Sequence, residues 1–277
     1  MDNFIILIIT GFLIGTFGTL IGAGGGFLLV PLLILTHPEL SPDIITAISI
    51  SIVAVNAISG SVAYSRSGRI DFKAGWHFAL YTIPGSVIGV FLTRFFPKES
   101  FYLVFGLLLL SLAAFLLVKN RRNAVPSPVK PHPPTRNWKH HRLTDREGIV
   151  FDYTYNQNYG ILVSIVVGFI SPLLGIGGGI IHVPAMVQWL QFPVYIATAT
   201  SHFILAIMST VSVIVHIIQG SYDSPYVLKM VAGLVIGVIP GAQLGAFLSH
   251  KIKTRTIIRI LAVCIGLVGV RILLKSI

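Results

Sequence analysis

Long apolar runs without charge limit this chain to very few folds. Residues 101–118 carry no charged side chain, and residues 227–247 carry only one. Helices of about 18 or more such residues are long enough to cross roughly 30 Å of hydrocarbon. Of the 277 residues, 54% are hydrophobic and 10% are charged, which is more apolar surface than a soluble domain can bury. The sequence therefore predicts an all-α polytopic membrane protein.

The amino terminus and the cysteine count argue against secretion and metal binding. Asp2 and Asn3 stand where a signal peptide would have basic residues, so a secretory leader is not expected. Cys264, the single cysteine, lies in an apolar segment. It can form neither an internal disulfide nor a cysteine-based metal site, and we expect no metal and no cofactor.

The net charge of +11 raises the question of nucleic-acid binding. The basic residues gather in short stretches between apolar segments, which is how orientation in a membrane is encoded, so no nucleic-acid partner is expected. The densest stretch lies in a linker, residues 119–158, which also holds five prolines between positions 126 and 134. We expect this linker to be extended or disordered in the cytoplasm, as a tether near anionic lipid.

The linker separates two similar halves, residues 1–118 and 159–277. The run GAGGG at 22–26, with Val-Pro at 30–31, returns as GIGGG at 175–179 with Val-Pro at 183–184, a shift of 153 residues. The segment IPGSVIGVFL from 83 returns as IPGAQLGAFL from 239. Ordered matches at nearly one shift indicate a tandem duplication.

Each half is predicted to contain a helical hairpin broken at the glycine run, followed by three transmembrane helices. The arms are 4–21 and 27–35 in the first half and 160–174 and 180–190 in the second. The long helices are 42–64, 74–95 and 100–118, and then 194–218, 226–248 and 256–274. The shorter arms rise only about 14 to 17 Å, half the hydrocarbon depth, so we expect re-entrant hairpins. The sequence leaves full crossing open.

Three net crossings per half require the two halves to have inverted topology. With the linker in the cytoplasm, the loops near Arg69 and Lys253 also lie inside, and both termini face the periplasm or the exterior. The loops near Glu39 and Asp223, which lie outside, hold no Lys or Arg, whereas Arg94 is an exception. This distribution favours the inverted arrangement.

The glycine runs suggest the chemistry of the site. Irregular backbone at membrane depth is tolerated where protein covers it or where it lines a polar cavity. A short helix starts after each run, so free N–H groups and the positive end of its dipole point into the break, as in anion sites. The candidate ligands are Gly22, Gly24, Gly25, Gly26, Gly175, Gly177, Gly178 and Gly179. The alternative is close helix packing, which we expect for the separate pairs Gly85/Gly89 and Gly241/Gly245.

Polar residues near these breaks complete the candidate substrate-binding set. Hydroxyl, amide and imidazole donors suit an oxyanion with several acceptor oxygens. The candidates are Ser49, Ser51, Asn56, His182, Thr200, Ser201 and His202. For the hydroxyls the alternative is hydrogen bonding within or between helices. No acidic residue falls within a predicted span, so coupling would use a histidine or the proton of the substrate.

Paired G-x-G-G-G segments followed by Val-Pro, with a later P-G-x-x-x-G in each half, resemble the TauE/SafE (TSUP) family of sulfite and organosulfonate exporters. The resemblance covers nearly the whole chain outside the linker. It implies a transporter in the bacterial inner membrane for small sulfur-containing or carboxylate anions, commonly sulfite, thiosulfate, sulfoacetate or taurine-related sulfonates.

Three functional classes compete at this stage. A secondary transporter working by alternating access explains the duplication, the inversion and the paired breaks. An anion channel or a passive uniporter for small carboxylates or oxyanions would use the same chemistry. A membrane hydrolase is disfavoured because Ser201 and His202 point about 100° apart on a helix and cannot form a dyad. The expected partners are a small anion and the lipid bilayer, and the oligomeric state, including a homodimer, stays open.

Overall fold

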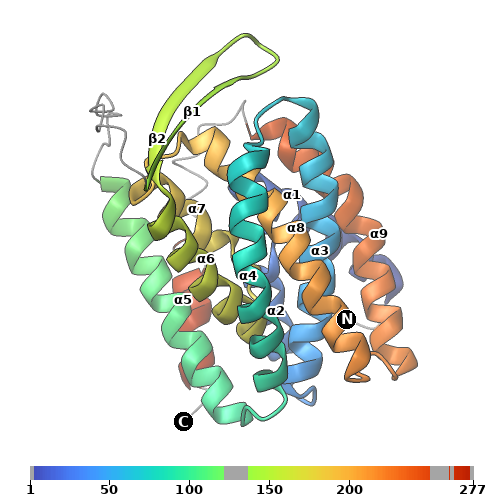
Figure 1. The fold of residues 1–277 in the computed structure, drawn as a ribbon. Helices are drawn as coiled ribbons and strands as arrows, with labels where there is room; N and C mark the ends of the chain where they lie inside the picture. The colour runs from blue at the N-terminus through green and yellow to red at the C-terminus, as the bar shows by residue number, and fades with distance from the viewer. Residues whose placement is uncertain (1–2, 122–136, 250–261, 263–264, 275–277) are drawn as a thin grey trace.

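The protein is a helical bundle with a small β-hairpin at one end (Figure 1). The computed structural model describes residues 3–121, 137–249, 262 and 265–274. The elements are α1 (Phe4–Ile21), α2 (Gly26–Thr36), α3 (Pro42–Arg66), α4 (Phe72–Thr93), α5 (Lys98–Arg121), β1 (Trp138–Thr144), β2 (Val150–Asn156), α6 (Gln157–Leu174), α7 (Gly179–Gln188), α8 (Val194–Ile218) and α9 (Pro225–Leu248). A short apolar helix, Ile265–Leu274, follows. Most of the predicted helix 256–274 lies outside the described residues.

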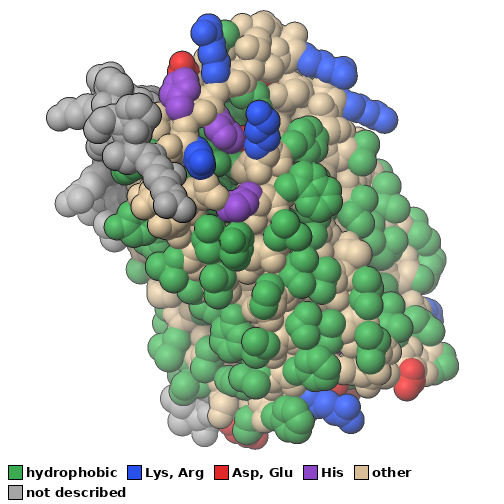
Figure 2. Space-filling model, in the orientation of Figure 1, with side chains coloured by type: hydrophobic (Ala, Val, Ile, Leu, Met, Phe, Trp, Pro, Cys, Tyr) green, Lys and Arg blue, Asp and Glu red, His purple; other side chains and the backbone are tan. Residues whose placement is uncertain are grey.

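Seven of the described helices are long and apolar enough to cross a membrane, which confirms a polytopic helical membrane protein. Helices α1 and α6 belong to this group with 18 residues each, whereas α2 and α7 have 11 and 10. The two arms of each broken hairpin are therefore unequal: the first is long enough to span and the second is not. In Figure 2, apolar side chains cover the visible face between two ends that carry charged residues.

Helices α3 and α8 pack against each other at the centre. On one side α9 packs against α3 and α1, and on the other α4 packs against α8 and α6. Small residues allow these close approaches. Gly85 and Gly89 of α4 lie against the α6 backbone, and Gly241 and Gly245 of α9 lie against the α1 backbone. These four glycines are packing residues, as the sequence predicted.

Glycine caps end the first arm of each half. Asn3 caps the start of α1 by accepting a hydrogen bond from the Ile5 amide, and Gly22, with φ 80°, caps its end. Asn156 caps the start of α6, and Gly175, with φ 69°, caps its end. Left-handed glycines terminate helices because they carry no Cβ that would clash in this conformation.

The second part of the linker is ordered, which the sequence interpretation did not anticipate. Strands β1 and β2 form an antiparallel pair in which Trp138 faces Asn156 and Thr144 faces Val150. Tyr153 and Tyr155 are buried against α4 and α7 and beside Phe192. The hairpin lies at the end of the bundle that also carries the α3–α4 loop, called here the linker end, whereas the α4–α5 and α8–α9 loops lie at the opposite end (Figure 1).

Candidate substrate-binding site

The two glycine breaks cross and touch in the middle of the bundle. Gly26, at the start of α2, lies so close to the carbonyl oxygen of Gly175 that an added Cβ would overlap it. Gly179, at the start of α7, lies against the carbonyl oxygen of Gly22 in the same way. Residues 22–27 and 171–180 are all buried. The contact is therefore reciprocal, and each break is covered by the other half of the chain.

Each break leaves amide groups at the start of a short helix. Neither Gly25 nor Gly178, the N-cap residues of α2 and α7, can supply a capping side chain. The Gly178 amide is bound by the Ser171 hydroxyl. Among the described residues, the amides of Gly25, Gly26 and Phe27 have no acceptor, nor do those of Gly179 and Ile180. Free amides at a helix N-terminus attract an anion.

Helices α3 and α8 hold the breaks in matching ways. Thr46 of α3 packs against Gly175, and Thr198 of α8 packs against Gly22. Ser49 Oγ donates a hydrogen bond of 2.6 Å to the Gly175 carbonyl oxygen. The third helix of each half therefore supports the break of the other half, and it brings its hydroxyl-bearing first turns to the crossing.

A buried polar network lies beside the first break. Thr19 Oγ1 donates to Asn56 Oδ1 at 2.8 Å and lies 3.3 Å from His202 Nε2. Tyr64 donates to the Thr19 carbonyl at 2.9 Å, and its ring meets the His202 ring edge-on. Asn56 and His202 are thus brought together as the sequence suggested. Thr19 and Tyr64 were not among the predicted site residues, although a threonine three residues before a glycine break was a visible signal.

Three fully buried polar atoms of α3 and α8 have no hydrogen-bond partner in the part of the chain that the structure describes. They are Asn56 Nδ2, Ser201 Oγ and His202 Nδ1. Asn56 Nδ2 faces Gly18, which in turn contacts the Gly25 amide. Burying an unsatisfied polar group costs free energy, so the two such groups beside the first break, on Asn56 and His202, point to a ligand.

The remaining predicted residues lie elsewhere. Ser51 Oγ is 2.7 Å from the Tyr222 hydroxyl, toward the α8–α9 loop. Thr200 Oγ1 accepts a hydrogen bond from the Asp71 amide at the linker end. His182 Nε2 lies 3.5 Å from Ser164 Oγ, on the side of α7 that faces α6. The structure does not bring these three side chains together with Asn56 and His202.

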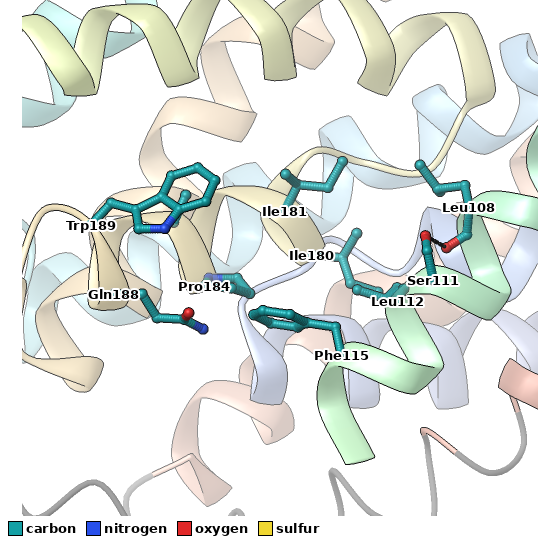
Figure 3. A pocket seen from close by; sticks show the side chains of 10 residues that line it. Leu108, Ser111, Leu112, Phe115, Ile180, Ile181, Pro184, Gln188 and Trp189 are labelled. Carbon is teal, nitrogen blue, oxygen red and sulfur yellow. Dashed lines mark hydrogen bonds between the residues drawn. The ribbon is translucent and has the colours of Figure 1, made fainter. Parts of the chain in front are cut away.

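A separate apolar cavity of about 360 Å³ lies between α5 and α7 (Figure 3). Leu112, Phe115, Ile180 and Ile181 line it, and Trp189 stands at one end. Its walls are apolar apart from Ser111 and Gln188, so they offer little to replace the hydration shell of an anion. The crossing, by contrast, carries free amides and hydroxyls, which are groups that can bind an anion.

The positive potential at the crossing comes from helix ends rather than from basic side chains. Arg69 is the buried basic residue among the described ones, and it lies at the linker end. In the same set, no three His, Cys, Asp or Glu side chains are placed to hold a metal ion. The arrangement can therefore bind a small anion through backbone amides, hydroxyls and an amide or imidazole N–H.

Comparison with known proteins identifies the family of this chain. Residues 7–272 match the family described as sulfite exporter TauE/SafE. Probable membrane transporter protein YunE of Bacillus subtilis is 31% identical over 99% of both chains. A probable membrane transporter protein of Methanocaldococcus jannaschii is 26% identical over 97% of this chain and 95% of its own. No solved structure matches the chain.

Proposed function

The chain belongs to the sulfite exporter TauE/SafE family and is a multi-pass membrane transporter rather than an enzyme, and on that premise we propose that it exports small sulfur-containing anions. Sulfite, sulfoacetate and related sulfonates are the proposed substrates. The family description names sulfite, and the printed names of the relatives state transport only. The proposed location is the inner membrane of a bacterium.

The observation that carries the proposal is the reciprocal contact of the two breaks. Gly26 approaches the Gly175 carbonyl as Gly179 approaches that of Gly22, so the N-termini of α2 and α7 converge on one place. Two helix N-termini supply free amides without the strong binding of a buried arginine. Modest affinity suits a protein that must release its substrate.

We further propose that the two halves are inverted repeats around this site. Helices at the same position in each half make equivalent contacts. The packing of α1 against α9 is matched by that of α6 against α4, and the packing of α3 against α9 is matched by that of α8 against α4. Helices α3 and α8 pack on each other. Exchanging the halves leaves this pattern unchanged, as a two-fold axis in the membrane plane requires.

The unpartnered side-chain atoms support an oxyanion as the substrate. Asn56 Nδ2 and Ser201 Oγ are donors, and His202 Nδ1 is a donor in one tautomer. A sulfite or sulfonate group presents three oxygens that can accept hydrogen bonds from such side chains and from free amides. Hydrogen bonds from the protein to these oxygens would thereby replace the hydrogen bonds that the anion makes to water in solution.

Alternating access is the proposed mechanism, because the breaks are buried from both ends in this structure. Export would need one end of the bundle to open, and then the other. The linker end is assigned to the cytoplasm. It carries Arg66, Arg69, Lys73 and the basic hairpin residues, as the positive-inside rule expects.

Counterflow in proteoliposomes tests this function. Vesicles loaded with unlabelled sulfite should accumulate labelled sulfite from outside, and excess sulfoacetate should compete. Saturable exchange supports a carrier. Conductance without saturation would show a channel instead, and absence of flux with sulfite, sulfoacetate, sulfonates and small carboxylates would refute anion transport.

A thermal-shift screen with the same anions gives an independent reading, since a bound ligand raises the unfolding temperature by mass action. Ser201→Ala should weaken the shift. Thr210→Ala is the matched control, because the Thr210 side chain is exposed and its hydroxyl bonds to the Ala206 carbonyl of its own helix. Equal shifts in both variants would remove Ser201 from the site.

A further inference from the structure

A second buried polar cluster lies at the linker end, away from the crossing. Asp71, which is only 5% exposed, precedes α4. Its Oδ2 lies 2.5 Å from His141 Nδ1 and accepts a hydrogen bond of 2.6 Å from the Tyr153 hydroxyl. Both partners come from the hairpin, His141 from β1 and Tyr153 from β2. One carboxylate thus joins both strands of the linker hairpin to the membrane bundle.

Asp71 also contacts the two helices nearest the hairpin. Its Oδ1 accepts from the Ala74 amide at 3.0 Å and caps α4. Its own amide donates to Thr200 Oγ1 of α8, also at 3.0 Å. The hairpin, α4 and α8 therefore meet at this single residue.

The first turns of α8 separate Asp71 from the glycine crossing. Thr198 packs against Gly22, so that a Cβ on Gly22 would lie 3.3 Å from the Thr198 Cα. Thr200, two residues later, bonds to Asp71. Residues two apart on a helix point about 200° apart, so these side chains face opposite ways. This stretch of α8 therefore lies between the two sites, with the break on one side and Asp71 on the other.

Two further sets of contacts hold the hairpin against the start of α8. The buried Arg69 guanidinium binds Asp145 Oδ2 at 3.2 Å, and it lies 5.5 Å from the Tyr195 ring at the start of α8. The rings of Tyr153 and Tyr155 pack 4.7 and 4.9 Å from that of Phe192, just before α8. The hairpin therefore covers the same end of α8 that Asp71 holds.

We propose that Asp71 is the positioning residue of a latch, formed with His141, Tyr153 and Thr200, that keeps the linker end closed over the substrate site. The latch holds the first turns of α8 against Gly22. Opening the linker end requires the hairpin to part from Asp71, which frees α8 to move from the break. This inference rests on the proposed function and adds how access to that same site is controlled.

Neighbouring histidines of β1 provide a matched pair of variants. His141 points inward to Asp71, whereas the exposed His140 pairs with the exposed Asp152 at 2.5 Å on the solvent side. His141→Ala removes a bond of the latch, and His140→Ala removes a histidine–carboxylate contact of the same kind outside it. A second pair is Tyr153→Phe and Tyr155→Phe, because only the Tyr153 hydroxyl reaches Asp71 among the described contacts.

Access to the break is measured by cysteine labelling in a Cys264→Ala background. A cysteine at Thr198 faces the break, and a cysteine at the exposed Lys139 shows which vesicle face carries the hairpin. A membrane-impermeant maleimide is added to either face of sealed vesicles. His141→Ala should speed labelling at position 198 about tenfold from the hairpin face, as expected for loss of a charge-assisted hydrogen bond of roughly 1.4 kcal/mol. His140→Ala should leave the rate unchanged.

Tyr153→Phe keeps the ring and removes only the hydroxyl, so it tests the latch if His141→Ala does not fold. It should also speed labelling from the hairpin face, whereas Tyr155→Phe, its control, should not. Unchanged rates in His141→Ala and Tyr153→Phe would overturn the latch, and so would equal increases from both faces. Labelling needs no substrate. Unchanged labelling with normal sulfite binding refutes the latch alone, whereas faster labelling without anion binding refutes the proposed function alone.

Discussion

Ser49 of α3 donates a 2.6 Å hydrogen bond to the carbonyl oxygen of Gly175, the residue at which α6 ends. The two residues come from different halves of the chain, so this bond ties the first half to the break of the second. Ser201 of α8 follows Thr198 by three residues, as Ser49 follows Thr46, yet its hydroxyl has no partner among the described residues. Ser49 therefore makes a bond between the halves that Ser201 does not make among the described residues.

Ser49→Ala should destabilise the protein. The Gly175 carbonyl would lose its donor in a buried place, at a cost of about 1 to 3 kcal/mol in unfolding free energy. Thermal unfolding in detergent measures this loss. Thr210→Ala, which removes an exposed hydroxyl, is the control and should change little. Equal losses in the two variants would contradict a structural role for the Ser49 bond.

Ser201→Ala should have the opposite effect on the protein without ligand. Removing a buried hydroxyl that lacks a partner relieves a desolvation cost, so the unfolding free energy should stay the same or rise by about 1 kcal/mol. The added stability produced by sulfite should fall. A variant that is destabilised without ligand, and equally stabilised by sulfite, would show that Ser201 serves packing.

Gly26→Ala should disrupt the crossing. The added Cβ would overlap the Gly175 carbonyl oxygen, and backbone cannot move aside as a flexible side chain can. A loss of about 1 to 3 kcal/mol is typical of overpacking, and sulfite binding should be lost as well. Gly266→Ala is the control in another helix, since its Cβ would meet Ala113 at an ordinary 3.4 Å. Binding unchanged in Gly26→Ala would remove the crossing from the site.

The repeated glycine runs and the apolar lengths were sufficient to predict most of the fold. Helices α3 and α8 begin at Pro42 and Val194, where the sequence placed them. Both features act locally: a helix needs uninterrupted apolar length, and left-handed glycines stop it. The predicted packing role of Gly85 and Gly241 also followed from a local spacing.

The hairpin was missed because proline content and charge dominated the interpretation of the linker. Phe151, Tyr153 and Tyr155 alternate with polar residues in β2, a period-2 pattern typical of a strand with one buried face. That face is buried only because Phe192 and Asp71, far away in sequence, are brought beneath it. Such tertiary contacts are not visible in the linker sequence itself.

The sequence predicted only part of the candidate site, because the position of several side chains also depends on tertiary contacts. Helical spacing placed Asn56 on the face of Ser49, and both lie near the breaks. Spacing could not show that Thr200 would turn to Asp71, or Ser51 to Tyr222, because partners on other helices decide which face of α3 or α8 is used. The binding roles of these residues stay predictions.

The latch predicts how the hairpin responds to acid. Burial alone would raise the pKa of Asp71, but hydrogen bonds from His141 and Tyr153, with one from an α4 amide, outweigh it and lower that pKa. A carboxyl with a lowered pKa in the folded state stabilises the fold fully above its unfolded pKa of about 3.9. This stability is lost as the pH falls from there through the lower folded value.

Asp71→Asn should therefore be less stable than the parent at pH 7, and the difference should shrink as the pH falls below about 4. Hydrogen exchange of the hairpin amides, measured from pH 7 to pH 3 and corrected for intrinsic exchange, measures this difference in stability at each pH. Asp152→Asn is the control, since Asp152 pairs with His140 on the exposed face of the hairpin. If Asp71→Asn lost protection by the same factor at every pH, the hairpin would be held by packing of Tyr153 and Tyr155 and not by the ionised Asp71 carboxylate.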